Sequence, residues 1–445
     1  MTRFLRVVVC LVAFAGLMLP AGGAQARGLA LIRDAEIERT LKQISAPVFQ
    51  AAGLAPESVE IYIIRSRSLN AFVAGGRRMF LNTGLMIELE QPEELLGVIA
   101  HEAAHIAGGH QARRAIQLRN AQGPALVGLL IGIAAGVAGG SEAGVAASAG
   151  SQEAIRRLLL KYNRAEEASA DQAALGYLER ARIDPAGLLS VLERFRGQEV
   201  LSIGNIDPYV VSHPLGAERM SLLQRRIGTF AGRDWPEDSN RTYWHARLRA
   251  KLEGFLHPNR VLNRLEDRPE TEFTLYAKAI ALHQDNDYQA ALREIDRLMA
   301  MRPGDAFYTE LKGQILYEIG RAGEAVPQYR EAARLAPQEP LIKAGLGRAL
   351  LQLGTARADA EALRVLQDAR RGDLADHASL RDLATAYDRA GDRGMATLAT
   401  AERYALLGDV KNAVSLARRA SGILPQGSPG WLRAQDILKL DQPDE

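Results

Sequence analysis

Hydrophobic and polar positions follow two different patterns along this chain. Up to about Phe230, β-branched runs alternate with glycine-rich loops and segments of helical spacing, whereas beyond about Glu270 the chain is rich in Ala and Leu with helical spacing almost throughout. A change of pattern on this scale predicts two separate cores. We therefore expect a mainly helical α+β domain over residues 27–255 and an all-helical domain over residues 270–440.

The C-terminal domain repeats itself at an interval of 34 residues. That interval separates Pro303 from Pro337 and Gly320 from Gly354. It is typical of tetratricopeptide repeats, in which each repeat is a pair of helices. We expect one such pair between residues 306 and 335, with its turn at Gly320. Stacked pairs form a solenoid whose surface binds peptides or partner proteins, although a purely structural spacer is the alternative.

The N-terminus has the pattern of a secretory signal peptide. Arg3 and Arg6 precede an uncharged apolar stretch over residues 7–19, and an Ala-Gln-Ala sequence ends at Ala26. This order predicts export and cleavage near Ala26, with an uncleaved anchor as the alternative. The apolar stretch is too short to span a bilayer comfortably.

Composition excludes several kinds of chemistry. Cys10 is the only cysteine and lies in the predicted signal peptide, so the mature chain is expected to have no disulfide, zinc–thiolate site or catalytic thiol. Loss of residues 1–26 removes two arginines and leaves equal numbers of basic and acidic side chains. Nothing in this balance suggests a nucleic-acid partner.

The candidate chemistry begins at the sequence His-Glu-Ala-Ala-His, residues 101–105. It lies in a segment of helical spacing over 93–106, so His101 and His105 are four residues apart on one face and can reach one metal ion. Glu102 stands beside them and can take a proton from water. Two imidazoles with a carboxylate and an open position are the arrangement of a hydrolytic zinc site.

A second acidic segment supplies a candidate third ligand. Glu167 and Asp171 are one helical turn apart in the sequence Arg-Ala-Glu-Glu-Ala-Ser-Ala-Asp. We expect Glu167 to bind the metal and Asp171 to accept a hydrogen bond from the distal ring nitrogen of a ligand histidine. On its own this segment would be an ordinary charged helix face.

A longer metzincin-type motif is the competing interpretation. That motif requires a histidine at the position of Gln111, whereas His110 comes one residue too early, and no methionine turn follows. We interpret His110 as a structural residue or a hydrogen-bond partner of a ligand.

The three motifs together resemble one peptidase family. His-Glu-Ala-Ala-His, Glu-Ala-Ser-Ala-Asp and Ser-His-Pro at 212–214 followed by Arg219 are similar to the family of the heat-shock protease HtpX and the CAAX prenyl protease. Members with a signal peptide and tetratricopeptide repeats are periplasmic metalloproteases with chaperone-like properties. The resemblance implies a gluzincin-type fold and one zinc ion per chain.

The resemblance also implies roles for single residues. His101, His105 and Glu167 would bind zinc, Glu102 would be the general base, and Asp171 would orient a ligand. The resemblance places His213 and Arg219 on the loop that closes the cleft. This histidine could fill the fourth zinc position and hold the enzyme inactive. Alternatively, His213 with Arg219 could hydrogen-bond the oxyanion that develops on the attacked carbonyl.

Two further segments bear on substrate and surroundings. Residues 70–74 and 78–82 have the pattern of strands, and an exposed edge there would bind an extended substrate through its main chain. Residues 124–140 carry no charge, and the small-residue composition continues to 150. We favour a lid near the active site over a peripheral membrane contact for 124–150; full spanning does not fit, because the metal ligands on either side must meet.

The sequence thus predicts a zinc-dependent endopeptidase of the periplasm. Its substrates would be unfolded or misassembled proteins recruited by the repeats, and the resemblance points to the outer-membrane protein assembly machinery as a partner. Two alternatives remain. The chain could be a periplasmic chaperone or adaptor with a largely latent metal site, or a zinc-stabilised scaffold with the fourth position permanently filled by His213.

Overall fold

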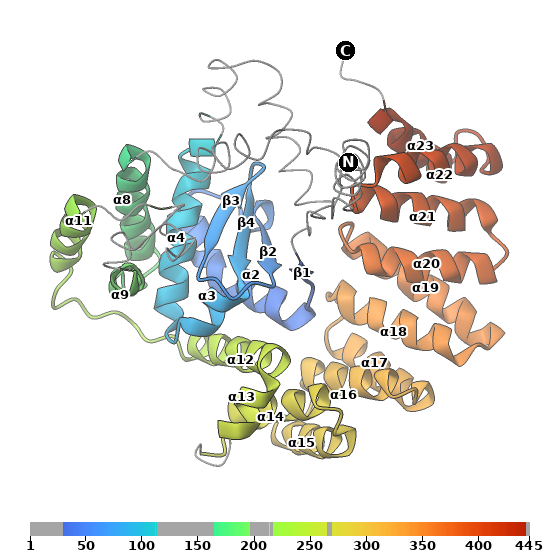
Figure 1. The fold of residues 1–445 in the computed structure, drawn as a ribbon, viewed down its shortest axis with the longest axis horizontal. Helices are drawn as coiled ribbons and strands as arrows, with labels where there is room; N and C mark the ends of the chain where they lie inside the picture. Colours follow the sequence, from blue (N-terminus) through green and yellow to red (C-terminus); the bar gives the residue numbers. More distant parts are fainter. Residues whose placement is uncertain are drawn as a thin grey trace, which may run out of the picture.

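The protein is described by a computed structural model that covers residues 30–111, 113, 164–195, 213, 217–264 and 269–441. Figure 1 shows two parts, a sheet covered by helices and an arc of stacked helix pairs. The predicted signal peptide at 1–26 and the segment 124–150 lie outside the described residues. None of the described helices is long and apolar enough to cross a membrane.

The N-terminal part is built on a four-stranded mixed sheet. Its strands are β1 (Leu31–Ile32), β2 (Glu60–Ile64), β3 (Ala71–Ala74) and β4 (Arg78–Asn82). They lie in the order β1-β2-β4-β3, with β2 and β4 parallel and the other two pairs antiparallel. β3 and β4 therefore match the strands expected from the sequence, and β3 is an edge strand of the described sheet.

The pairing of β3 with β4 determines which main-chain groups of β3 point away from β4. Asn82 donates its backbone N–H to the carbonyl of Asn70 at 3.0 Å, and Val73 pairs with Met79 three positions later. Hydrogen-bonded and non-hydrogen-bonded pairs alternate along an antiparallel ladder. The N–H and C=O groups of Val73 therefore point away from β4, toward the outer edge of the described sheet.

The helices of this part pack on the sheet and on one another and form most of the N-terminal core. They are α2 (Ala35–Ala51), α3 (Thr83–Glu88), α4 (Pro92–Ala107), α8 (Arg164–Arg180), α9 (Ala186–Arg194) and α11 (Ala217–Gly228), with the short 3₁₀ helix η1 (Pro56–Ser58). The core is dominated by Leu, Ile, Val and Met side chains from α2, α4, α8, α9 and the sheet. Helix α4 lies at its centre (Figure 1).

Local sequence explains where α4 begins and how closely it packs. Pro92 occupies the first turn, where its missing N–H costs nothing, and the Glu94 carboxylate accepts backbone N–H groups of Glu90 and Gln91 at 2.9 and 3.1 Å. A Cβ at Gly97 would lie 2.8 Å from the main chain of Leu188 on α9. Glycine at this position therefore lets α4 and α9 pack backbone against backbone.

The C-terminal part consists of helix pairs, as the 34-residue interval predicts. Its helices are α14 (Glu272–Gln284), α15 (Tyr288–Met301), α16 (Ala306–Glu318), α17 (Ala322–Leu335), α18 (Pro340–Leu353), α19 (Ala356–Gly372), α20 (His377–Arg389), α21 (Arg393–Leu406), α22 (Val410–Ile423) and α23 (Pro429–Leu438), ending in η5 (Lys439–Asp441). Gly320 and Gly354 have φ angles of +80° and +65°. Both follow the first helix of a pair, where glycine adopts this conformation without strain.

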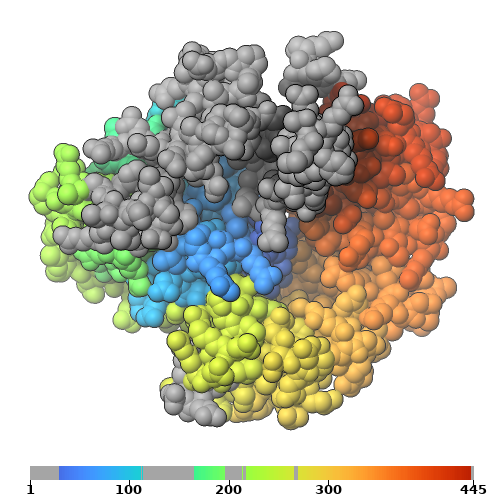
Figure 2. All heavy atoms as spheres, in the orientation of Figure 1, coloured from blue at the N-terminus to red at the C-terminus, as the bar shows by residue number. Residues whose placement is uncertain are grey.

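Helix α12 (Ser239–Leu256) joins the two parts and is followed by α13 (Pro258–Arg264). Leu248 and Leu252 of α12 belong to the N-terminal core, whereas Ala250 belongs to the first core of the repeats. The expected boundary at residue 255 therefore falls at the end of a helix that both cores share. Figure 2 shows the two parts as one continuous body that meets along this region.

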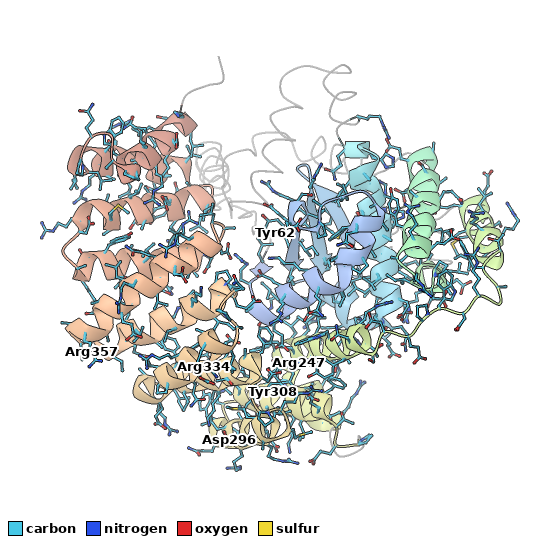
Figure 3. All side chains as sticks on the ribbon, turned by 180° about the vertical axis from the view of Figure 1, so that it is seen from behind. Tyr62, Arg247, Asp296, Tyr308, Arg334 and Arg357 are labelled. Carbon is cyan, nitrogen blue, oxygen red and sulfur yellow. The ribbon has the colours of Figure 1, made fainter. Side chains whose placement is uncertain are left out.

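A second contact is made by α2. Its residue Ala35 packs in one apolar cluster with Phe307 of α16, Ile342 of α18 and Ala332 of α17. Beside this cluster, Arg247 of α12 lies between the two parts next to Tyr308, as the labels in Figure 3 show. The repeats are therefore fixed to the N-terminal part by both apolar and ionic contacts.

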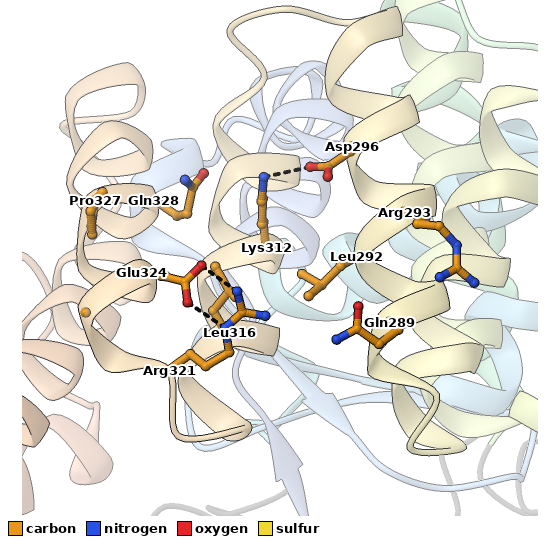
Figure 4. Close-up of a pocket in the computed structure, with 11 residues that line it drawn as sticks. Gln289, Leu292, Arg293, Asp296, Lys312, Leu316, Arg321, Glu324, Pro327 and Gln328 are labelled. Atoms are coloured by element: carbon orange, nitrogen blue, oxygen red, sulfur yellow. Dashed lines mark hydrogen bonds and ion pairs between the residues drawn. The ribbon is translucent and has the colours of Figure 1, made fainter.

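The repeats also carry a groove of about 510 Å³ between α15 and α17, with α16 at its floor (Figure 4). Leu292 and Leu316 supply its apolar surface. Two ion pairs lie within it, Lys312–Asp296 at 2.6 Å and Arg321–Glu324 at 2.5 Å. Because most of its charges are paired internally, the groove has no strong excess of either sign.

Candidate metal centre

Helix α4 places three polar side chains in the centre of the N-terminal core. His101, Glu102 and His105 are all 0% exposed. Burial of polar and ionisable groups is costly unless they are hydrogen-bonded or coordinate a metal. Three such groups within five residues of a core helix therefore indicate a functional site.

Helix α8 supplies carboxylates from the opposite side, as the sequence predicts. Glu167 approaches both histidines: its Oε2 lies 3.4 Å from His101 Nε2, and its Oε1 lies 3.4 Å from His105 Nε2. Asp171, one turn later, lies 3.0 Å from His101 Nδ1 through its Oδ1. The two motifs, more than sixty residues apart in the sequence, thus meet at one point.

His213 completes the group. Its Nδ1 lies 3.3 Å from His101 Nε2 and 3.2 Å from Glu167 Oε2, and its side chain is fully buried. The ligand atoms of His101, His105, Glu167 and His213 all lie within 4.8 Å of one another. Four donors from three segments of the chain therefore surround one small volume.

Five separations between the candidate donors are close to those of a tetrahedral zinc site, while the whole set lies within 4.8 Å. Donors about 2.0–2.1 Å from a tetrahedral ion must be about 3.3 Å from one another. The observed separations are 3.1 Å between the two Nε2 atoms of α4 and 3.2–3.4 Å for the contacts described above. Three imidazoles and one carboxylate are also donors that zinc accepts. The residues present therefore fit a zinc ion.

Comparison with known proteins agrees with this geometry. The model of peptidase family M48 matches residues 32–227, and the tetratricopeptide repeat model matches residues 276–340 and 310–373. The N-terminal part is a peptidase M48 domain. This confirms the family resemblance and the fold class expected from the sequence, a metallopeptidase domain followed by a helical repeat domain.

Relatives extend the match over most of the chain. The Beta-barrel assembly-enhancing protease of Escherichia coli (strain K12) is 25% identical over 425 residues, which cover 94% of this chain and 85% of the relative. That of Yersinia pestis is 24% identical over 374 residues, covering 82% and 75%. The Mitochondrial metalloendopeptidase OMA1 of Schizosaccharomyces pombe is 26% identical over 188 residues, covering 42% and 51%. The chain is therefore a metalloendopeptidase.

Solved structures add less. A structure of MamA aligns with 34% of this chain and 86% of its own length at 22% identity, with a TM-score of 0.31. This score is too low to support a shared fold.

In the M48 domain, neighbouring charges set the protonation of the candidate ligands. Burial lowers the pKa of His101, but hydrogen bonds with Asp171 and Glu167 outweigh burial and raise it to about 9. Burial lowers the pKa of His105 to about 3. With their Nε2 atoms 3.1 Å apart, the two rings cannot both be protonated. Without a metal, the extra proton therefore belongs on His101.

Both carboxylates are held as anions. Burial raises the pKa of Glu167, but His213, His101 and His105 hold it well below its usual range. Burial also raises the pKa of Asp171, but Arg219 outweighs burial and lowers this pKa to about 2. Two buried anions beside three imidazoles favour binding of a cation.

Arg219 lies behind the site, on the first turn of α11. Its Nε and Nη2 donate to the two oxygens of Asp171 at 2.6 and 2.9 Å, and its Nη1 lies 2.9 Å from Glu167 Oε2. It therefore orients a candidate ligand and the residue that orients His101. Beyond it, Asp171 and Arg219 line a cavity of about 430 Å³ between α8 and α11. A role for Arg219 at the oxyanion stays a prediction.

Glu102 lies beside the four candidate metal ligands but is not one of them. Neither of its carboxylate oxygens has a hydrogen-bond partner among the described residues. Its Oε1 lies 3.3 Å from His213 Nε2, at ion-pair distance but without hydrogen-bond geometry. Burial raises its pKa, opposed by His213 and His101. A desolvated carboxylate next to the metal position is well placed to accept a proton.

Two contacts go beyond what the sequence specifies: the ligand that His110 contacts, and the two carboxylates that Arg219 contacts. His110 lies 2.8 Å from His105 through the Nδ1 atoms of both rings, and Arg219 contacts two carboxylates at once. The only sequence signal for the first contact is the glycine pair at 108–109. Gln111, the position that metzincins would fill with a ligand, donates instead to the carbonyl of Val73 on β3.

Proposed function

We propose that this metalloendopeptidase uses one zinc ion per chain, acts in the periplasm, and degrades misfolded or stalled outer-membrane proteins that its repeats recruit. The observation that carries the zinc assignment is the buried cluster of His101, His105, Glu167 and His213 with Glu102 beside it. Export is supported by the signal-peptide pattern at residues 1–26. The substrate class is supported by relatives named Beta-barrel assembly-enhancing protease.

Each residue of the site has a distinct part in hydrolysis. When bound, zinc supplies Lewis acidity that polarises the scissile carbonyl and eases deprotonation of water. Glu102 accepts the proton of the attacking water and delivers it to the leaving amine. Asp171 keeps His101 in the tautomer that presents Nε2 to the metal, and Arg219 holds Asp171 and Glu167 in place.

The outer edge of β3 in the described sheet is where we place the substrate. The N–H and C=O groups of Val73 face this edge, and an extended main chain can add to them as a further strand. Such binding uses main-chain atoms and so suits unfolded proteins of varied sequence. In the structure the Gln111 side-chain amide donates a hydrogen bond to the Val73 carbonyl. An incoming substrate strand must therefore displace this side chain.

His213 closes the site in this conformation. Its Nδ1 lies 3.3 Å from His101 Nε2 and 3.2 Å from Glu167 Oε2, so it would be a fourth ligand of a bound zinc ion, and its Nε2 lies 3.3 Å from Glu102 Oε1. The His213 imidazole would thus fill the fourth metal position through one nitrogen and contact the proposed general base, Glu102, through the other. Of the two roles considered for this residue, the geometry favours that of a plug, so that activity requires its withdrawal.

Metal removal tests the zinc assignment. We expect exhaustive chelation to lower the rate of casein cleavage by at least about 100-fold, because Lewis-acid activation is worth several kcal/mol. One molar equivalent of zinc should restore the rate. A Glu102→Gln sample prepared in parallel measures contaminating proteases. An undiminished rate in the chelated protein would contradict the proposal.

The substrate class needs a separate comparison. An unfolded outer-membrane β-barrel protein and the same protein folded in detergent micelles should be given to the zinc-loaded enzyme. We expect cleavage of the unfolded form and protection of the folded one, since a substrate must present a free strand to β3. Equal cleavage of both forms would contradict this proposal while leaving the zinc assignment intact.

A further inference from the structure

We propose that His110 is a positioning residue for the metal ligand His105. The Nδ1 atoms of the two rings are 2.8 Å apart, and the His110 side chain is only 3% exposed. His105 directs its other nitrogen, Nε2, at the metal position. The inference deepens the zinc site of the proposed function and rests on it.

The contact fixes the tautomer of His105. A neutral imidazole carries its proton on one nitrogen and a lone pair on the other. A metal ligand must present its lone pair to the ion, so His105 must carry its proton on Nδ1. His110 Nδ1 can accept that proton in a hydrogen bond if its own proton lies on Nε2. Ligand histidines generally need such an acceptor, which fixes both tautomer and ring orientation.

The chain is built to bring His110 to this position. Gly108 ends α4, and Gly109 has a φ angle of +61°, which reverses the chain so that His110 returns to His105. A Cβ at Gly108 would lie 2.7 Å from His110 Nε2 and 2.9 Å from the carbonyl of Ala104. No side chain fits at Gly108 unless the imidazole moves. Gly108 and Gly109 therefore help to hold His110 against His105.

The two ligands on α4 thus have acceptors of different kinds. His101 has the carboxylate of Asp171, itself held by Arg219, whereas His105 has a neutral imidazole. A carboxylate increases the basicity of its ligand, whereas a neutral acceptor mainly orients it. His110 is thus expected to affect zinc affinity through the orientation of His105, without touching the metal or the substrate.

Zinc affinity, measured by competition with a chromophoric chelator, tests the inference independently of catalysis. We expect His110→Ala to raise the zinc Kd by about 10–100-fold. His110→Asn should recover most of the loss, because its carboxamide oxygen can accept from His105 Nδ1. Gly108→Ala should weaken binding in the same direction, because its methyl group displaces the imidazole.

Controls separate positioning from general destabilisation. His245 on α12 is also a buried histidine, 1% exposed, and lies outside the site, so His245→Ala should leave the zinc Kd unchanged even if it lowers the melting temperature. A wild-type Kd in His110→Ala, or a Kd in His110→Asn as weak as in His110→Ala, would overturn the inference. His105→Ala must lose binding in the same assay; if it does not, the proposed zinc site itself fails.

Discussion

Glu102→Gln is expected to lower kcat for peptide hydrolysis by about 10²–10⁴-fold, the usual contribution of a positioned general base. Glutamine has almost the same shape as glutamate but cannot accept the proton of the attacking water. The carboxylate is 0% exposed, and neither of its oxygens has a hydrogen-bond partner among the described residues. Removing its charge should therefore leave the fold intact and should not lower the melting temperature.

The measurement is casein cleavage under single-turnover conditions, with zinc content and melting temperature determined on the same samples. Glu90→Gln is a matched control, because Glu90 is exposed and lies two residues before the start of α4. The control should keep the wild-type rate. If Glu102→Gln also kept it, the general base would lie elsewhere in the chain.

Arg247→Ala is expected to destabilise the chain by about 3–5 kcal/mol, the usual effect of removing one partner from a buried ion pair. Arg247 is 0% exposed and contacts Glu36 of α2 and Asp305, the N-cap of α16. Its guanidinium carbon also lies 3.9 Å from the ring centroid of Tyr308. One arginine therefore joins the peptidase domain to the repeats. Its loss leaves the buried Glu36 carboxylate with Lys251 and Tyr276 as its described partners and removes the ion pair with Asp305.

Urea-induced unfolding, followed by circular dichroism, gives the free energy of unfolding of the wild type and of each variant. Arg330 on α17 is a suitable control, because it also contacts a carboxylate, that of Glu361, yet its side chain is 53% exposed. Arg330→Ala should cost at most about 1 kcal/mol, as exposed ion pairs do. Equal effects of the two substitutions would show that the buried cluster does not hold the two parts together.

Local spacing is enough to predict which candidate ligands share a face of each helix. His101 and His105 share a face because helical periodicity is set by the backbone, and the same holds for Glu167 and Asp171. The repeats are equally predictable, since their 34-residue interval reflects helix pairs that each contact only their neighbours. The strands at 71–74 and 78–82 follow from alternation and from the glycine pair between them.

The features that the sequence does not predict depend on tertiary contacts. Nothing near Arg219 in the sequence indicates that it contacts Asp171 and Glu167, because the carboxylates come from a helix about fifty residues earlier. The Ser-His-Pro motif at 212–214 alone could not distinguish between the two roles considered for His213. The sequence also does not show that α12 contributes side chains to two different cores.

The most direct test of the account is the rate of casein cleavage by zinc-loaded His213→Ala relative to wild type. If His213 closes the metal site and contacts Glu102, its removal should raise the rate, by about tenfold or more where the closed form predominates. A His213→Ala protein as inactive as Glu102→Gln would contradict this account and make His213 part of the catalytic apparatus.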